Sequence, residues 1–269
     1  MNIAIVIPVY REPLPEEIIS LRRCCEVLNR YTMFIVAPEE LSLTSYEDIW
    51  QSYGLSYKVE RFAYSYFENI AGYNRLLLSE EFYIRFQEYD YILIYQPDAY
   101  VFADRLTEWC KKGYDYVGAP LIGNFAEKEY YPEMPMRVGN GGLSLRRVQA
   151  YLDYFASEKN VFTSKQIVER ISLWKKPYTR IFVWLLMMLG WRNRPTSLAK
   201  HWKYNEDDFW SGVLDDTRYA MSKPLPEEAL LFAFERFPKE MYAITNQLPF
   251  GCHAWLKYQY EDFWKDHIG

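Results

Sequence analysis

Hydrophobic residues in the first half of the chain occur in short continuous runs that alternate with helically spaced positions. Three runs, at residues 3–9, 32–37 and 91–95, are typical of buried strands, and 57–62 is predicted as another strand. A further strand is predicted at 114–117. Apolar residues three and four positions apart predict helices over 15–30, 73–86 and 105–111.

This alternation of strands and helices predicts an α/β fold. A strand, a crossing helix and a second strand form a βαβ unit, and its repetition gives a mostly parallel sheet with helices on both faces. With 269 residues the chain can bury a full core, so we expect one main domain.

Net charge and cysteine usage narrow the class of protein. A formal net charge of −5 argues against a nucleic-acid binder that relies on a basic surface, so we expect no nucleic-acid partner. The four cysteines have no paired metal-ligand spacing, and Cys24 and Cys25 are adjacent. The first apolar run has the pattern of a strand rather than a signal peptide, and we therefore expect a cytoplasmic protein.

The strand at 91–95 ends in Gln96, Pro97 and Asp98. In open parallel sheets ligands bind just beyond the carboxyl ends of the strands, so Asp98 stands where a cofactor or metal would lie. Pro97 and Asp98 are also common turn residues, and a plain turn explains them equally well.

Four other segments carry residues suited to binding or catalysis, and each has a plain structural explanation. Residues 5–12 form a strand that ends in proline, and 138–147 hold three glycines among four positions, as a tight turn would. Residues 205–210 contain three consecutive carboxylates, which the helix dipole favours at a helix start. Residues 249–255 contain His253, and a lone histidine is more often structural than a ligand.

In combination, these segments resemble GT-A glycosyltransferases. More closely, the chain is similar to uncharacterised bacterial glycosyltransferase-like proteins of surface polysaccharide synthesis. The resemblance implies a Rossmann-like GT-A domain over 1–269, with a nucleotide-binding half at 1–120 and an acceptor-binding, catalytic half at 121–269. It implies a transferase that moves a sugar from a nucleotide-sugar donor to a glycan or lipid-linked saccharide acceptor.

The resemblance also implies residues that contact the donor nucleotide. They come from the first loop, from a helix start, from the end of the strand at 91–95 and from the glycine-rich segment. These are Pro8, Val9, Tyr10, Glu12, Asn74, Gln96, Asp98, Gly141 and Gly142. Arg146 and Arg147 follow the glycines, and either could meet phosphate or be a solvated surface charge.

The acidic segment corresponds to the motif that supplies the catalytic base in inverting GT-A enzymes. Asn205 is a suitable N-cap, which would put the carboxylates in the first helical turn. Asp207 matches the family's base best, and Glu206 and Asp208 are the alternatives. We therefore predict transfer with inversion at the anomeric carbon.

The resemblance implies a divalent metal bound by Asp98 and His253. Carboxylate and phosphate oxygens suit Mg²⁺ or Mn²⁺, and the histidine favours Mn²⁺. The chain departs from the family's Asp-x-Asp pattern, because Gln96 stands at the first aspartate. Arginine or lysine side chains could stabilise the leaving group instead.

Residues 160–203 differ in character from the rest of the chain, and we expect a helical insertion there. The centre, 181–191, is apolar but too short to span a bilayer. Nine basic residues surround it against Glu169 alone: Lys165, Arg170, Lys175, Lys176, Arg180, Arg192, Arg194, Lys200 and Lys203. This pattern suits the anionic surface of the inner membrane, and a buried core helix with solvated ends is the alternative.

Two other functions fit the same residues. A protein of this fold could bind a nucleotide or glycan without turnover, or serve as a scaffold at a membrane surface. Loss of donor hydrolysis in an Asp207→Asn variant would distinguish an enzyme from a binding protein.

Overall fold

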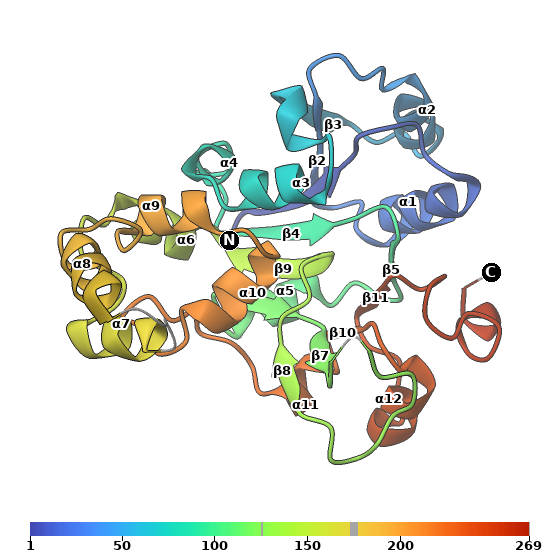
Figure 1. The fold of residues 1–269 in the computed structure, drawn as a ribbon. Helices are drawn as coiled ribbons and strands as arrows, with labels where there is room; N and C mark the ends of the chain where they lie inside the picture. The colour runs from blue at the N-terminus through green and yellow to red at the C-terminus, as the bar shows by residue number, and fades with distance from the viewer. Residues whose placement is uncertain (125, 173–176, 269) are drawn as a thin grey trace.

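The computed structural model describes residues 1–124, 126–172 and 177–268. Within this described chain a six-stranded sheet forms the centre of the molecule, and β9 alone runs antiparallel to its neighbours (Figure 1). In spatial order the strands are β3 (Tyr57–Phe62), β2 (Thr32–Pro38), β1 (Ile3–Pro8), β4 (Tyr91–Tyr95), β9 (Leu143–Arg147) and β6 (Tyr116–Gly118). The predicted mostly parallel sheet is confirmed.

One face of the sheet is covered by α1 (Pro15–Val27), α2 (Thr44–Ser52) and α5 (Leu106–Lys111). Alternate strand residues such as Ile5, Ile35 and Leu93 point to this side, where they pack with Trp50 and Trp109. The four cysteines are free and buried.

The opposite face is covered by α3 (Ile70–Leu77), α4 (Glu80–Ile84) and α6 (Val148–Ala156). Val6 and Ile94 point to this side and belong to an aromatic core with Tyr83, Tyr151 and Trp210. The ring centroids of Tyr83 and Tyr151 are 4.2 Å apart in a stacked arrangement. Helices on both faces are thereby confirmed.

The helix predicted over 73–86 is instead two helices. The Ser79 hydroxyl accepts a hydrogen bond from the Phe82 N–H, at 3.2 Å, and so begins α4 as its N-cap. Helix α1 also ends three residues earlier than predicted, because Leu28 leaves helical geometry at the C-cap. The spacing of apolar residues continues across the break between α3 and α4 and across the end of α1. The sequence pattern alone therefore does not show where these helices end.

A small three-stranded sheet brings the end of the chain against the loop that follows β4. Its strands are β10 (Ala233–Phe234), β11 (Gly251–His253) and β5 (Ala99–Val101). The antiparallel β11–β5 register sets His253 opposite Ala99. Strands β7 (Pro120–Ile122) and β8 (Met136–Val138) form a separate antiparallel pair.

Three helices form a lobe at the left of Figure 1: α7 (Ser164–Ile171), α8 (Pro177–Met188) and α9 (Pro195–His201). They confirm that the predicted insertion is helical, although Lys175 and Lys176 of its basic set lie outside the described residues. No helix in the described chain combines the length and the apolar character that crossing a membrane requires.

The acidic segment follows the lobe directly. It forms α10 (Glu206–Asp208), which continues into a turn of π-helix, η2 (Phe209–Val213). The remaining elements are η1 (Tyr64–Tyr66), α11 (Pro226–Ala229), α12 (Pro238–Thr245) and η3 (Trp264–Asp266).

Candidate active site

The loop after β4 is held in place by backbone hydrogen bonds. The Gln96 N–H donates to the Gly142 carbonyl at 2.9 Å, and the Ala99 N–H donates to the Gln96 carbonyl at 2.8 Å. The Ala254 N–H donates to the Asp98 carbonyl at 3.0 Å. The Asp98 side chain remains 47% exposed, so its carboxylate can reach a ligand.

His253 joins three polar side chains that are distant in sequence. Its Nε2 lies 3.1 Å from Gln96 Oε1 and 3.3 Å from Asp98 Oδ1. Its Nδ1 lies 3.2 Å from Glu235 Oε1. Glu235 is buried, and its Oε2 has no hydrogen-bond partner in the described structure. Sequence analysis missed Glu235, although a Glu-Arg pair within the apolar run 229–237 was a signal for it.

Two carboxylates determine the charge of this histidine. Burial alone would lower the pKa of His253, but the carboxylates of Asp98 and Glu235 outweigh it and raise the pKa to about 10. Burial likewise acts to raise the pKa of Asp98, and the neighbouring imidazolium lowers it on balance. Asp98 and His253 therefore form an ion pair.

The glycine-rich segment allows two functional side chains to lie against the backbone. A Cβ on Gly141 would approach Glu206 Oε1 to 2.5 Å and Asp207 Cβ to 3.5 Å. A Cβ on Gly142 would clash with the imidazole ring of His253. Gly141 and Gly142 are neighbours in the chain, and consecutive Cα atoms are about 3.8 Å apart. Because one lies against the acidic helix α10 and the other against His253, these two groups belong to one site.

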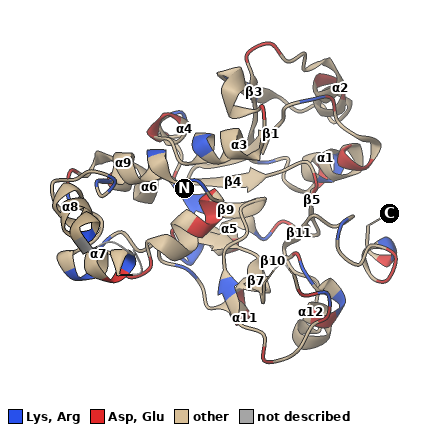
Figure 2. Cartoon of the chain, in the orientation of Figure 1, with Lys and Arg blue, Asp and Glu red and all other residues tan. Residues whose placement is uncertain are grey.

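Glu206 is not free to act as a base, because it is fully engaged by Arg146. Both side chains are buried, and the guanidinium donates two hydrogen bonds to the carboxylate, at 2.7 Å and 3.0 Å. Arg146 also donates to Tyr83 Oη at 3.0 Å. Figure 2 shows the acidic start of α10 beside the basic end of β9. This buried pair removes Arg146 as a phosphate ligand, and the half-exposed Arg147 pairs with Asp115.

The other two carboxylates of α10 differ from each other. Asp208 forms an ion pair with Arg137. Asp207 has no cationic partner among the described residues, and its Oδ1 accepts the Asp208 N–H at 2.7 Å. Burial, with Glu206 and Asp208 nearby, raises the pKa of Asp207 to about 7. A carboxylate that titrates near neutral pH suits a general base.

Asn74 fixes the start of the acidic helix. Its Oδ1 accepts the Glu206 N–H at 3.0 Å, and its Nδ2 donates to Asn205 Oδ1 at 3.4 Å. Asn205 is the N-cap in backbone conformation, as predicted, but its side chain makes no capping bond. Asn74 supplies the cap from another helix, so its observed contacts are with α10.

A cavity of about 520 Å³ opens beyond the carboxyl ends of β1 and β4. Five of the residues predicted to contact the donor line it: Pro8, Val9, Tyr10, Gln96 and Asp98. Four others, Glu12, Asn74, Gly141 and Gly142, are not among the described residues that line this cavity.

Four tyrosines contribute to the cavity wall, and sequence analysis assigned only Tyr10 of them to the donor site. They are Tyr10, Tyr46, Tyr64 and Tyr73. Arg11 also lines it, but its guanidinium is held by Glu17 through two hydrogen bonds of 2.8 Å. Tyr rings can stack on a flat base, and the volume is in the range of small-ligand sites.

The oxygen and nitrogen atoms around Asp98 that could ligate a metal suit a divalent cation only in part. A carboxylate oxygen, an amide oxygen and an imidazole nitrogen converge at Asp98, Gln96 and His253. No group of three or more His, Cys, Asp and Glu side chains within the described residues is arranged to hold a metal. The set fits a cation such as Mg²⁺, which commonly takes one or two protein carboxylates and completes its shell with phosphate oxygens.

Comparisons with known proteins leave the activity open. A family model described as a protein of unknown function (DUF5672) matches residues 56–253. No curated protein matches the chain in sequence. Solved structures that resemble it include core-mannan synthase A from Aspergillus fumigatus in an Mn/GDP form, with 9% identity, a TM-score of 0.44 and coverage of 78% of this chain and 71% of that one.

Two further structures are also glycosyltransferases. The galactosyltransferase LgtC, in complex with donor and acceptor sugar analogues, shares 11% identity at a TM-score of 0.47, with coverage of 93% and 86%. A glycosyltransferase involved in glycosylation of the major capsid of the virus PBCV-1 shares 14% identity at a TM-score of 0.41, with coverage of 100% and 99%. With TM-scores below 0.5, these similarities carry no argument about this chain.

Proposed function

Because this chain belongs to the family described as a protein of unknown function (DUF5672), we propose its function from its own site. It is a GT-A-type glycosyltransferase that moves a sugar from a nucleotide-sugar donor to a hydroxyl of a glycan or lipid-linked saccharide acceptor. One observation carries the proposal. Gly141 and Gly142 bring Asp207 and the Asp98–His253 pair together beside a cavity that could hold a nucleotide.

The cavity is proposed as the nucleotide site. It lies beyond the carboxyl ends of β1 and β4, where ligands bind in open α/β sheets. Stacking of the base on a tyrosine would leave the diphosphate directed toward Gln96 and Asp98. Asn69 and Tyr73 contribute further polar groups to the wall.

Asp98, Gln96 and His253 are proposed to hold a divalent cation, Mn²⁺ or Mg²⁺, together with the donor's diphosphate oxygens, and His253 would release its Nε2 proton as the cation binds. When bound, the cation would neutralise the charge of the departing nucleoside diphosphate. Lys257 acts electrostatically on Asp98 and could contribute positive charge to the same leaving group.

Asp207 is proposed as the general base. Its carboxylate takes the proton of the acceptor hydroxyl as that oxygen bonds to the anomeric carbon, and the bond from this carbon to the diphosphate breaks. Attack from the face opposite the leaving group gives inversion. Glu206 holds the helix through Arg146, and Asp208 is neutralised by Arg137, so neither competes for this role.

Release of nucleoside diphosphate from nucleotide sugars tests the proposal directly. Asp207→Asn should lower turnover by about 10²–10⁴-fold while nucleotide binding remains, because general-base catalysis contributes about that much. Asp216→Asn is a matched control, since this carboxylate is exposed and lies outside the site. Nucleotide binding without release by the wild-type protein would favour a binding protein that lacks turnover.

A cytoplasmic protein that works at the inner face of the membrane would suit a lipid-linked acceptor. The basic and apolar lobe supports this location. Cell fractionation would test it, because a peripheral protein leaves the membrane fraction at high salt.

A further inference from the structure

Helix α8 is apolar on two opposite faces, and the described structure covers one of them. On the inner face Val183 is buried, and Trp184 and Met187 pack against the core. The Trp184 Nε1–H donates to Ser164 Oγ at 3.0 Å, which ties α8 to α7. A helix that is hydrophobic all round is normally buried in a core or a membrane.

The outer face of α8 is an exposed apolar stripe. Its residues recur at intervals of three and four along the helix and its C-terminal end, so they lie on one side. Their exposed fractions run from 39% to 79%: Tyr178, Ile181, Phe182, Leu185, Met188 and Leu189. Trp191, 41% exposed, follows. A contiguous apolar patch of this kind marks an interaction surface.

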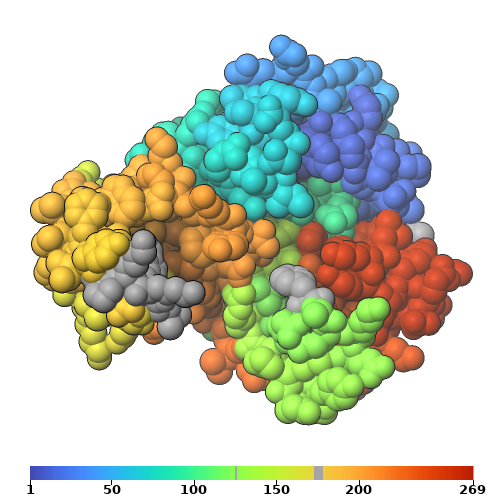
Figure 3. Space-filling view, in the orientation of Figure 1, coloured from blue at the N-terminus to red at the C-terminus, as the bar shows by residue number. Residues whose placement is uncertain are grey.

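The charge around this stripe is strongly positive, although the whole chain carries a net −5. Among the described residues of 158–203, two glutamates, Glu158 and Glu169, stand against eight basic residues. These are Lys159, Lys165, Arg170, Arg180, Arg192, Arg194, Lys200 and Lys203. The lobe that carries them projects at the left of the molecule in Figure 3.

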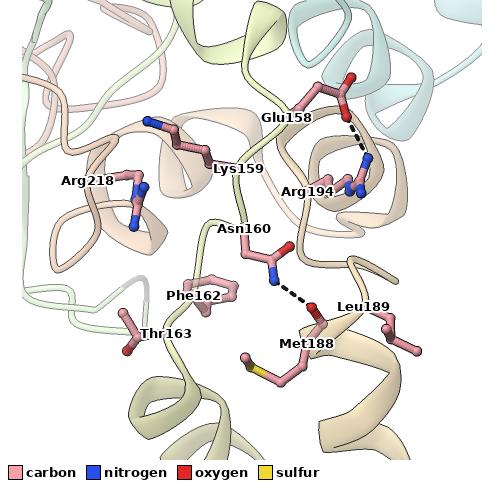
Figure 4. A pocket seen from close by; sticks show the side chains of 9 residues that line it. All are labelled: Glu158, Lys159, Asn160, Phe162, Thr163, Met188, Leu189, Arg194 and Arg218. Atoms are coloured by element: carbon pink, nitrogen blue, oxygen red, sulfur yellow. Dashed lines mark hydrogen bonds and ion pairs between the residues drawn. The ribbon is translucent and has the colours of Figure 1, made fainter.

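A pocket of about 470 Å³ adjoins the C-terminal end of the stripe, and Figure 4 shows its lining. Met188 and Leu189 belong to both the stripe and the pocket. Lys159 and Arg218 lie together on another side of it, and within the described chain neither side chain has an acidic partner. Arg194 is neutralised by Glu158, at 2.6 Å. The pocket therefore offers two uncompensated cations next to apolar surface.

We propose that the outer face of α8 docks on an anionic lipid surface, with the stripe among the acyl chains and Lys159 and Arg218 at phosphate head groups. Large apolar side chains flanked by Lys and Arg are the pattern of helices that lie in the membrane interface. Charge complementarity favours lipid over a second copy of this chain. A two-fold contact would set each basic lobe against its own like charge.

Vesicle sedimentation of the full chain, without nucleotide or acceptor, tests docking independently of the proposed enzyme activity. One set of vesicles is phosphatidylcholine, and the other contains equal parts of phosphatidylcholine and phosphatidylglycerol. We expect binding to the mixed vesicles that falls at least about tenfold in Phe182→Glu/Leu189→Glu, because charge in the apolar face opposes insertion. The matched control, Leu225→Glu/Ile244→Glu, changes two exposed apolar residues elsewhere and should bind like the wild type.

Lys159→Glu/Arg218→Glu should weaken binding to the mixed vesicles and leave the weak binding to phosphatidylcholine unchanged. Equal binding to both vesicle types, or by the wild type and Phe182→Glu/Leu189→Glu, would overturn the proposal. The proposal would also fail if the wild type were a dimer and Phe182→Glu/Leu189→Glu converted it to a monomer. All variants should keep the wild-type thermal midpoint, since the changed residues are exposed.

Discussion

The carboxylate of Asp207 differs from its two neighbours because no cation in the described chain neutralises it. Its pKa of about 7 predicts that kcat/KM falls tenfold per pH unit below about pH 7, as the protonated acid cannot accept the acceptor's proton. A pH profile with a soluble acceptor would measure this. A profile that stays flat down to pH 5 would exclude Asp207 as the base.

The same residue should couple stability to pH. Its folded-state pKa lies above the ordinary value of 3.8, so the folded state holds the proton more tightly than the unfolded state does. The resulting stabilisation is present in acid and is lost as pH rises through about 7. Asp207→Asn should therefore gain stability over the wild type at pH 8 and not at pH 4, measured by urea unfolding. Asp216→Asn, at an exposed carboxylate outside the site, is the control.

The buried pair of Arg146 and Glu206 predicts a large loss of stability when one partner is removed. Arg146→Met leaves a carboxylate without its cation in the core, which costs about 3–5 kcal/mol. Urea unfolding should show this loss and its partial recovery in Arg146→Met/Glu206→Leu. The control is Arg147→Met, because Arg147 is half-exposed in its pair with Asp115 and should cost below about 1 kcal/mol. If Arg146→Met and Arg147→Met lost the same free energy of unfolding, the larger structural role given to the buried Arg146–Glu206 pair would be contradicted.

At the scale of elements, strand β11 can approach the loop after β4 because position 142 has no side chain. Gly142→Ala sets a methyl group against the His253 ring, which must turn away from Gln96 and Asp98. We expect weaker nucleotide binding and a loss of about 1–3 kcal/mol of stability, measured by calorimetric titration and thermal unfolding.

Gly212→Ala provides the comparison. A Cβ there would meet only Arg137 Nη1 at an ordinary 3.5 Å, so both measurements should stay close to the wild type. If Gly142→Ala bound nucleotide as tightly as Gly212→Ala does, the contacts of His253 would not be needed for the donor site.

The buried strands were predictable because a strand that is covered on both faces needs apolar residues at successive positions. Residues 91–95 form such a strand with the predicted bounds. Residues 57–62 also form a strand with the predicted bounds, although it is an edge strand in which only Phe62 is buried. Helix ends were less predictable, since they depend on single hydrogen bonds. Ser79 starts α4 in the middle of an unbroken apolar pattern, and Leu28 ends α1 by backbone geometry alone.

Individual site residues could be predicted where a motif is local in sequence. Their roles could not be predicted where the deciding contact joins residues far apart in the chain. From the resemblance, sequence analysis predicted Asp98 and His253 as ligands of one metal, and in the structure the two side chains form an ion pair. It favoured Asp207 as the base but kept Glu206 as an alternative, because the partner of Glu206, Arg146, is 60 residues away. Asn74, predicted at the donor, caps the acidic helix across 132 residues, and its role toward the donor stays a prediction.

At the scale of the whole molecule, the proposed lipid surface and the proposed catalytic base belong to one continuous stretch of chain. Helix α9 leads from the lobe to Trp202, whose Nε1–H donates to the Asn205 carbonyl at 2.9 Å. The acidic helix begins at the next residue. A membrane-bound orientation would therefore fix the side from which a lipid-linked acceptor approaches Asp207.

Donor binding should stabilise the whole fold, because the cavity joins β1, β4 and the loop before α3. A ligand at 100 times its Kd adds about 2.7 kcal/mol to the unfolding free energy, or roughly 5–10 °C in Tm for a chain of this size. We expect one of UDP, GDP, ADP, CDP and dTDP to give such a shift with Mn²⁺. Asp98→Ala should reduce the shift, whereas Asp207→Asn should retain it, since Asp207 acts on the acceptor. A screen in which no nucleotide raises Tm would argue against a donor site in this cavity, and vesicle binding by α8 would then stand on its own.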